Sequence, residues 1–375
     1  MLKVLKSALT EKSCEGSSER LLQLCFGYFG FYVLNGLAVK YFTAKDPVSG
    51  LAQMTDVAYL VYSGMGSMTV CVLIVLVLKW YKLKSTHDVT IMGMTMPAEY
   101  LYIIPSGICT AVVIPTTTMM YTLPISVMVA MVIMRATVIV VSRLVDSVQV
   151  AQGILHKKVY WEENMAVLFA IVAACMNMFG AKGKDFDFIH NKPAMIILTA
   201  YIIAYAIRIY IMNYYKNTRP KGTPQHNEGF FAVEQITAFL TTVIAAVLAF
   251  KMLPDTLNPS SFINLYHDCI YNPPSAWMGA IVGGLPYGAA AFFSVFLFMF
   301  KGRTATFAGV VNRLTSLIAG TAATLLAVWL LGAKPPKQSE WISLAFILVA
   351  IVFLTRAEKR RTAELLAAKE IEKAC

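Results

Sequence analysis

Long apolar runs separated by short polar stretches dominate the pattern along the chain. A helix needs roughly 20 apolar residues to cross the hydrocarbon core of a bilayer. Ten runs have this length, and each is predicted to be a membrane-spanning helix: 21–42, 58–80, 99–122, 124–144, 163–181, 193–215, 230–252, 276–300, 303–332 and 338–356. The first run is too long for a secretory signal, and no small-residue cleavage site follows it. The pattern therefore predicts an all-α membrane protein with ten transmembrane helices.

Composition agrees with this prediction. Of the 375 residues, 58% are hydrophobic and only 14% are charged, whereas soluble domains carry about 25% charged residues. The net charge of +11 raises the possibility of nucleic-acid binding, but most basic residues fall in short loops and at the chain ends. That distribution is typical of membrane topology, so the expected partners are the lipid bilayer and a small molecule, with no nucleic acid.

The lysines and arginines also predict the orientation. Of 32 such residues, 21 lie at the termini and in the loops of one side, 8 lie on the opposite side, and Arg135, Arg208 and Arg313 lie inside spans. Because positive loops stay in the cytoplasm, both termini are expected to be cytoplasmic. The pattern leaves open whether the membrane is a plasma or inner membrane or that of an organelle.

A shift of 178 residues brings similar stretches of the two halves into register. The matches are FYVLN (31–35) with IYIMN (209–213), Asp56 with Glu234, Arg135-Ala-Thr137 with Arg313-Leu-Thr315, and, at a shift of 177, LFAIVA (168–173) with AFILVA (345–350). Several matches at nearly one offset indicate duplication of a five-helix unit. Because five is odd, the second copy crosses the membrane in the opposite sense, which is the inverted repeat common in secondary transporters.

The predicted organisation follows from the spans and the repeat. It comprises a cytoplasmic N-terminal segment (1–20), a first five-helix repeat (21–185), a second five-helix repeat (186–356) and a charged, cytoplasmic C-terminal tail (357–375).

These features resemble the drug/metabolite transporter superfamily, which includes EamA-type permeases, nucleotide-sugar and triose-phosphate translocators, and chloroquine-resistance-type transporters. The resemblance covers roughly residues 20–356 and lies in the five-plus-five spans, the cytoplasmic termini and two very short connections, at Leu123-Pro124 and at Lys301-Gly302-Arg303. It implies that spans 1, 3, 4, 6, 8 and 9 line a central cavity. It therefore also implies that Arg135, Arg208 and Arg313 belong to cavity-lining helices.

Arg135 and Arg313 are the main candidates for substrate binding. Arg135 lies 11 and Arg313 lies 10 residues past the start of its span, which is about 15–16 Å deep and near the membrane midplane. An arginine there costs roughly 2.5–3.5 kcal/mol on insertion scales, so it should face a wet cavity or a carboxylate. Two guanidinium groups facing one cavity repel each other unless an anion lies between them. The alternative is that each arginine only ties neighbouring helices together.

Other polar residues in the spans complete the candidate site. The predicted substrate-binding set is Arg135, Arg313, Arg208, Asn35, Asn213, Thr137, Ser316 and Tyr287. Arg208 could instead form a salt bridge, with Glu234 as its partner. Asp56 and Glu234, each placed at the head of a span, are candidates for a gate or for proton coupling. Acidic residues at helix starts can also simply interact with the helix dipole.

Several chemistries have no visible motif in the sequence. There is no P-loop, GxSxG, HExxH or CxxC pattern, so we expect neither an enzyme nor a cofactor or metal site. The sequence predicts a secondary active transporter of a small anionic organic metabolite, held near the midplane between the repeats and moved by alternating access. Open alternatives are an EamA-type exporter of neutral or cationic amphiphiles or amino acids, a lipid flippase, and a non-transporting membrane receptor or scaffold. A homodimer is also possible.

Overall fold

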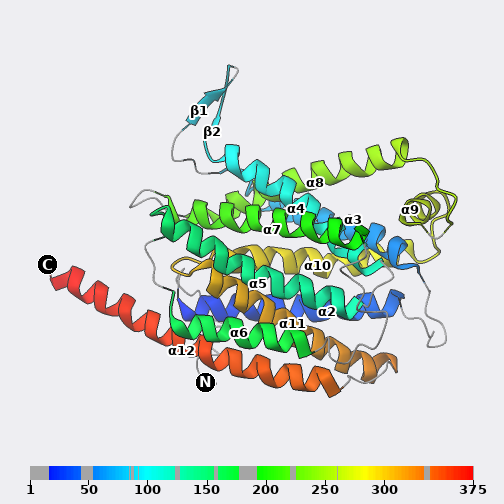
Figure 1. The fold of residues 1–375 in the computed structure, drawn as a ribbon. Helices are drawn as coiled ribbons and strands as arrows, with labels where there is room; N and C mark the ends of the chain where they lie inside the picture. The colour runs from blue at the N-terminus through cyan, green and yellow to red at the C-terminus, as the bar shows by residue number, and fades with distance from the viewer. Residues whose placement is uncertain are drawn as a thin grey trace.

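The computed structural model describes residues 17–43, 54–83, 85, 88–91, 93–122, 127–155, 159–176, 192–219, 225–259, 261–332 and 338–374. The predicted connection between spans 3 and 4, the predicted boundary at 185–186 and most of the N-terminal segment lie outside these residues. Within them, the chain forms eleven helices and one two-stranded hairpin (Figure 1).

In chain order the elements are α2 (Ser18–Thr43), α3 (Asp56–Val77), β1 (Asp88–Ile91), β2 (Met94–Pro97), α4 (Tyr100–Thr122), α5 (Val127–Ala151), α6 (Trp161–Met176), α7 (Lys192–Asn217), α8 (Asn227–Met252), α9 (Phe262–Tyr271), α10 (Trp277–Phe298), α11 (Ala305–Leu331) and α12 (Gln338–Ala374). Each of the ten predicted spans coincides with a helix over most of its length. The last span and the charged tail form one continuous helix, α12.

Eight of the described helices are long and apolar enough to cross a membrane. They are α2, α3, α4, α7, α8, α10, α11 and α12. The protein is therefore a multi-pass integral membrane protein. The predicted spans 124–144 and 163–181 coincide with α5 and α6, which are not among the eight, and α6 is described over 16 residues. Ten crossings thus stay a prediction.

The structure contains two elements that the hydrophobic pattern does not predict. One is the β1–β2 hairpin between α3 and α4, whose turn contains Gly93 at a φ of +81°. Its strands have four residues each, which is too short to give a clear sequence signal. The other is α9, a short helix in the connection after α8. The Ser261 side chain caps α9 by accepting a hydrogen bond of 3.2 Å from the Asn264 amide.

The position of Glu234 differs from the prediction. The register of the two halves places it at the head of a span, but α8 begins at Asn227. Glu234 therefore lies about two turns inside the helix. The residues that precede Glu234 in α8 are helical because they are packed against other helices. Asn227 is buried, and so are Phe230 and Phe231. Asp56, its predicted counterpart, does stand at the first position of α3 and is exposed.

Helix contacts follow the same pattern in the two halves (Figure 1). α10 packs against α3 and α2, while α4 packs against α8 and α7. Similarly, α11 contacts α2 and α5 contacts α7. α6 packs along α12, and α5 along α11. The helices of the two halves can be matched in order: α2, α3, α4, α5 and α6 with α7, α8, α10, α11 and α12. When every helix is exchanged for its match, each contact named above becomes either itself or another contact named above.

Glycines allow α3 and α10 to approach closely. A methyl group added at Gly66 would lie 1.9 Å from the Ile281 carbonyl oxygen, and one added at Gly284 would lie 2.0 Å from the Ser63 carbonyl oxygen. Small residues play this role between membrane helices, where backbones touch without intervening side chains. This contact forms one wall of the bundle.

The glycine contact gives the first prediction. Gly66→Ala should lower the free energy of unfolding by about 1–3 kcal/mol, because the backbones of α3 and α10 must separate to admit the methyl group. Gly64 is the matched control on the same helix, since a methyl group there would meet nothing within 4 Å. Thermal unfolding of both purified variants measures the difference. Equal unfolding temperatures for the two alanine variants would show that the contact is not tight.

The second prediction concerns topology. The β1–β2 hairpin and the segment between α8 and α9 lie at opposite ends of the bundle (Figure 1). In a background without the native cysteines, Thr95→Cys and Leu257→Cys should therefore react with an impermeant thiol reagent from opposite sides of the membrane. Both positions are exposed, Leu257 at 106%. Labelling of both from one side would contradict the arrangement of the spans.

Candidate functional site

A cavity of about 120 Å³ lies inside the bundle, between helices of both halves. Its walls come from α2, α3, α4, α5, α7, α8, α10 and α11. These walls contain five tyrosines and three arginines, together with smaller polar residues: Ser67, Thr110, Thr117, Gln235, Ser294 and Asn312. No aspartate or glutamate is among the described residues that line it. The central cavity is therefore polar, aromatic and positively charged.

All three arginines that the sequence places inside spans line the central cavity. Arg135 comes from α5, Arg208 from α7 and Arg313 from α11. Three helices that are distant in sequence thus bring their buried positive charges to one place. Such a concentration of like charge is unfavourable in an apolar bundle unless each charge is balanced locally.

Arg208 is balanced by a carboxylate of the protein. Its Nε lies 2.9 Å from Glu234 Oε1 and its Nη2 lies 3.0 Å from Oε2, a bidentate ion pair. Glu234 Oε1 also accepts hydrogen bonds from Ser106 Oγ at 2.7 Å and from Thr110 Oγ1 at 3.3 Å. Glu234 is fully buried. The salt bridge that the sequence suggested is confirmed, and it joins α4, α7 and α8.

Arg313 has a different environment. Its guanidinium carbon lies 5.2 Å from the centre of the Tyr205 ring, a cation–π contact. Its Nε and Nη2 atoms are shielded from solvent and have no hydrogen-bond partner among the described residues. Arg135, which lines the cavity from α5, donates from Nη2 to the Tyr32 hydroxyl at 3.5 Å. The aromatic contact alone does not satisfy the hydrogen-bonding donors of Arg313.

Tyrosines supply most of the aromatic surface of the cavity. They are Tyr28, Tyr32, Tyr201, Tyr205 and Tyr287. The rings of Tyr28 and Tyr32 are 5.5 Å apart on α2, and those of Tyr201 and Tyr205 are 4.9 Å apart on α7. Each ring offers a flat apolar face and a hydroxyl group. The cavity can therefore accept a ligand that has both a planar or apolar part and a charged part.

The structure separates the predicted site residues into two groups. Arg135, Arg208, Arg313 and Tyr287 line the central cavity. The others do not belong to its lining: Asn35, Thr137, Asn213, Ser316, Asp56 and Glu234.

Hydrogen bonds within their own helices occupy two residues of the second group. The amide of Asn213 donates to the Ile209 carbonyl at 2.9 Å, and the hydroxyl of Ser316 donates to the Arg313 carbonyl at 2.8 Å.

Sequence reasoning missed most of the tyrosines, together with Gln235 and Asn312. A signal was present on α2 and α7, where Tyr28/Tyr32 and Tyr201/Tyr205 are spaced four residues apart and therefore share a helix face. Arg208 follows Tyr205 by three residues on the same face. Asn312 directly precedes Arg313, and its amide nitrogen donates to Ser294 Oγ at 2.9 Å.

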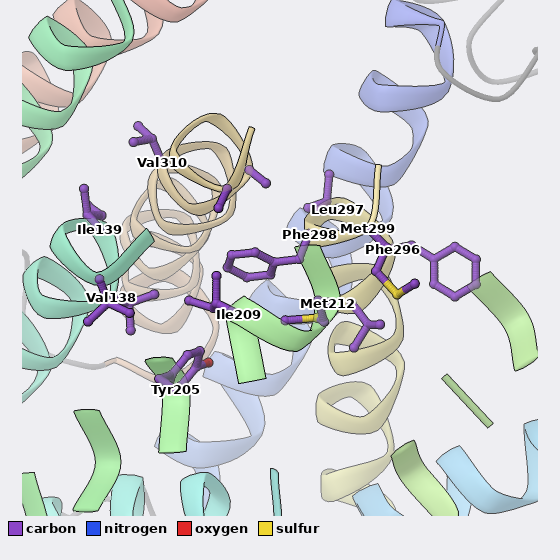
Figure 2. Close-up of a cluster of buried hydrophobic side chains, with 14 of the residues drawn as sticks. Val138, Ile139, Tyr205, Ile209, Met212, Phe296, Leu297, Phe298, Met299 and Val310 are labelled. Carbon is purple, nitrogen blue, oxygen red and sulfur yellow. The ribbon is translucent and has the colours of Figure 1, made fainter. Parts of the chain in front are cut away.

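Apolar packing closes the bundle between the cavity and the end where α2 begins and α12 leaves, here called the termini end. Ile209, Met212, Phe298 and Met299 are completely buried there, and Val310 from α11 lies in the same cluster (Figure 2). Tyr205 lies at the edge of this cluster and also lines the cavity. Buried apolar side chains therefore pack the bundle next to Tyr205 on the side of the termini end.

Ion pairs and helix caps reinforce the termini end. The Asp146 carboxylate accepts hydrogen bonds from the amides of Ala305 at 2.8 Å and Thr306 at 2.6 Å, at the start of α11. Ion pairs at this end include Arg361 with Glu163 at 2.6 Å, Arg219 with Glu99 at 3.3 Å, and Arg303 with Glu358. The Tyr160 hydroxyl donates to Glu364, and burial raises the pKa of Tyr160 above its ordinary value. None of these acidic residues was predicted.

In the described part of the chain, no group of three or more His, Cys, Asp or Glu side chains is arranged to hold a metal ion. The polar groups that line the cavity are guanidinium, amide and hydroxyl groups, together with the Cys71 thiol.

The buried ion pair gives the third prediction. Glu234→Gln should lower the free energy of unfolding by about 3–5 kcal/mol, because the Arg208 charge stays buried without its partner. A double variant, Arg208→Met with Glu234→Leu, should recover part of this loss. Asp56→Asn is the control, since Asp56 is exposed at a helix start. Thermal unfolding of the three variants and the native protein measures these differences in stability. An unchanged unfolding temperature for Glu234→Gln would argue against the ion pair.

No protein-family model matches the sequence, and no curated protein matches it. The structure does match 23 chains of solved structures. One of them, described only as "Crystal structure of protein", superposes with a TM-score of 0.57 over 92% of this chain and 99% of its own, at 13% sequence identity. At this identity the likeness shows a shared arrangement of helices and no more.

Proposed function

We propose that this protein is a secondary active transporter of a small anionic organic metabolite, with the architecture of the drug/metabolite transporter superfamily. The observation that carries the proposal is the environment of Arg313. This arginine lines an internal cavity, and its Nε and Nη2 atoms have no hydrogen-bond partner among the described residues. The anionic group of a substrate is the partner that these donors require.

Arg208 provides an internal comparison. Both arginines line the same cavity, but Arg208 has Glu234 as a bidentate partner. Arg313 has the Tyr205 ring, a contact that contributes about 0.5–2 kcal/mol. A charge-assisted hydrogen bond contributes about 1.5–3 kcal/mol, so an anion bonded to two guanidinium nitrogens would stabilise Arg313 more than the ring does. Arg208 thus acts as a structural ion pair, and Arg313 as the ligand-binding cation.

The pattern of helix contacts supports an inverted repeat. Matching the helices of the two halves in order relates α5 to α11, the helices that carry Arg135 and Arg313. In secondary transporters built from inverted repeats, the substrate site lies between the repeats near the bilayer midplane. The cavity is lined from all six helices that the superfamily resemblance implies, with additional residues from α3 and α8. The fold shared with a solved structure agrees with this architecture but says nothing about the substrate.

Alternating access would require the termini end to open. That end is now closed by the buried layer around Phe298 and Met299, and the distribution of lysines and arginines favours a cytoplasmic location for it. Opening would separate ion pairs such as Arg361–Glu163. Glu234 accepts four hydrogen bonds, which favours a role in holding Arg208 over a role as proton carrier. A gate role for Asp56 stays a prediction.

The alternative of a cationic substrate is disfavoured by the same arginines. It would require carboxylates that neutralise them, and no described residue is bonded to Nε or Nη2 of Arg313. A receptor or scaffold would retain the charged α12 but would move no solute across the membrane. Exchange of organic anions in proteoliposomes separates these classes.

The fourth prediction tests the proposed function in proteoliposomes. Among the organic anions screened in counterflow, the one transported fastest by the native protein becomes the assay substrate. Arg313→Gln should weaken its apparent affinity roughly tenfold to a hundredfold, because about 1.4 kcal/mol corresponds to each factor of ten. Arg313→Lys should recover only part of the loss, since an ammonium group replaces a planar guanidinium.

Lys82→Gln is the control for a loss of positive charge outside the cavity, because Lys82 is exposed after α3. This variant should transport at the native rate. Native affinity and rate for a folded Arg313→Gln variant would show that Arg313 only ties helices together. Failure of the native protein to move any organic anion would remove the transporter proposal itself.

A further inference from the structure

We infer that the anionic group held in the central cavity is a carboxylate, bound side-on by the Nε and Nη2 atoms of Arg313. This inference rests on the proposed function and specifies its substrate class. The substrate would be a small organic acid with a planar or apolar part that lies against the tyrosines and a hydrogen-bond donor near its carboxylate.

The geometry of the other buried arginines supports a carboxylate. Arg208 binds Glu234 through Nε at 2.9 Å and Nη2 at 3.0 Å. Arg303 binds Glu358 through the same two atoms, with Nε at 2.7 Å from Oε2. These atoms form one edge of the guanidinium group, whose two parallel N–H bonds match the spacing of carboxylate oxygens. Arg208 and Arg303 thus both use this edge to bind a carboxylate.

Arg313 lines the cavity, and the same edge of its guanidinium group has no described partner. The two atoms without a hydrogen-bond partner are its Nε and Nη2, the pair that Arg208 and Arg303 use. The Tyr205 ring contacts the guanidinium group at 5.2 Å and restricts its orientation. A guanidinium whose position is fixed before binding loses less conformational entropy when the ligand binds.

Asn312 points to a hydrogen-bond donor beside the anionic group of the ligand. Its amide nitrogen donates to Ser294 Oγ at 2.9 Å, while its Oδ1 is buried and has no partner among the described residues. A buried acceptor without a partner is destabilising, and a donor on the ligand would remove this cost. Neither an ionised carboxylate nor a fully ionised phosphate carries a donor itself, so this donor must come from a neighbouring group of the ligand. A carboxylate with a neighbouring hydroxyl, amide N–H or ammonium group satisfies both Arg313 and Asn312.

Size and shape restrict the substrate further. The cavity volume of about 120 Å³ is small, and ligand pockets for drug-sized molecules span roughly 300–1,000 Å³. The faces of Tyr28, Tyr32 and Tyr201 offer stacking surfaces for one ring or a short apolar chain. Nucleotide-sized ligands do not fit this conformation of the cavity.

The fifth prediction uses four probes that share a phenyl ring: phenylacetate, mandelate, benzylphosphonate and 2-phenylethanol. Binding to the purified full-length protein is measured from ligand-induced shifts in thermal unfolding across a concentration series. Mandelate should bind most tightly because it has both a carboxylate and a hydroxyl group. Phenylacetate should bind at least tenfold more tightly than benzylphosphonate, and 2-phenylethanol should cause no shift.

Two variants connect this ranking to the named side chains. Arg313→Lys keeps the positive charge but lacks the planar edge, so it should lose the preference of phenylacetate over benzylphosphonate. Asn312→Leu should abolish the advantage of mandelate over phenylacetate while leaving phenylacetate affinity within about threefold. Neither result is expected from a general loss of stability, because each is a ratio of affinities within one variant. If a variant does not fold, the ranking in the native protein still tests the carboxylate assignment.

Benzylphosphonate binding as tightly as phenylacetate would overturn the carboxylate assignment, and so would an unchanged preference in Arg313→Lys. If benzylphosphonate or inorganic phosphate is transported in an Arg313-dependent way and the carboxylates are not, the inference fails and the proposed function stands. If none of the three anionic probes binds and no organic anion is exchanged in proteoliposomes, both fail together.

Discussion

A guanidinium group buried inside an apolar helical bundle needs a partner of opposite charge, and this constraint governs the centre of the structure. Transferring an arginine to the middle of a membrane costs several kcal/mol unless water, a carboxylate or another anion compensates it. Arg208 meets this requirement with Glu234, whose remaining bonds come from Ser106 and Thr110. Arg313 does not meet it with any described hydrogen-bond acceptor at Nε and Nη2. The difference between these two arginines distinguishes a structural charge from a binding charge.

The packing of the helices places these charges in one cavity. Close contact between α3 and α10 depends on glycines, which bring one wall of the cavity together without large side chains. At the termini end, by contrast, large apolar side chains fill the bundle, among them Ile209, Met212 and Phe298 (Figure 2). The cavity lies between the glycine contact of α3 with α10 and the apolar cluster at the termini end. It is lined by tyrosines, which tolerate both an apolar neighbour and a polar ligand.

Much of the architecture could be predicted from the sequence, because membrane spans depend on the length of apolar runs. Helices were expected wherever α2 to α8 and α10 to α12 occur, whereas α9 and the hairpin were not, since short elements in polar connections leave little periodicity. The arginines were identifiable because charge is rare in a span. Their pairing was only partly predictable: Glu234 was proposed for Arg208 although its place in α8 was wrong.

The features that the sequence did not predict depend on contacts between segments that are distant in sequence. Asp146 caps α11 from a position 159 residues away in sequence, and Thr304 binds Glu163 from 141 residues away. Nothing in the local sequence distinguishes these acidic residues from ordinary loop charges. Tyrosines in an apolar helix are equally ambiguous, because packing against neighbouring helices and lining a cavity favour the same residue type. Asn213 and Ser316 illustrate the opposite error, since polar residues within a span can bond to their own helix.

The most direct test of the central claim is a structure of the purified protein with 4-bromophenylacetate, located by the anomalous scattering of bromine. We expect the bromine in the central cavity among the tyrosines, with both carboxylate oxygens about 2.7–2.9 Å from Nε and Nη2 of Arg313. A protein side chain bonded to this edge of Arg313, or a bromine signal confined to sites outside the cavity, would contradict the assignment of Arg313 as the anion-binding residue.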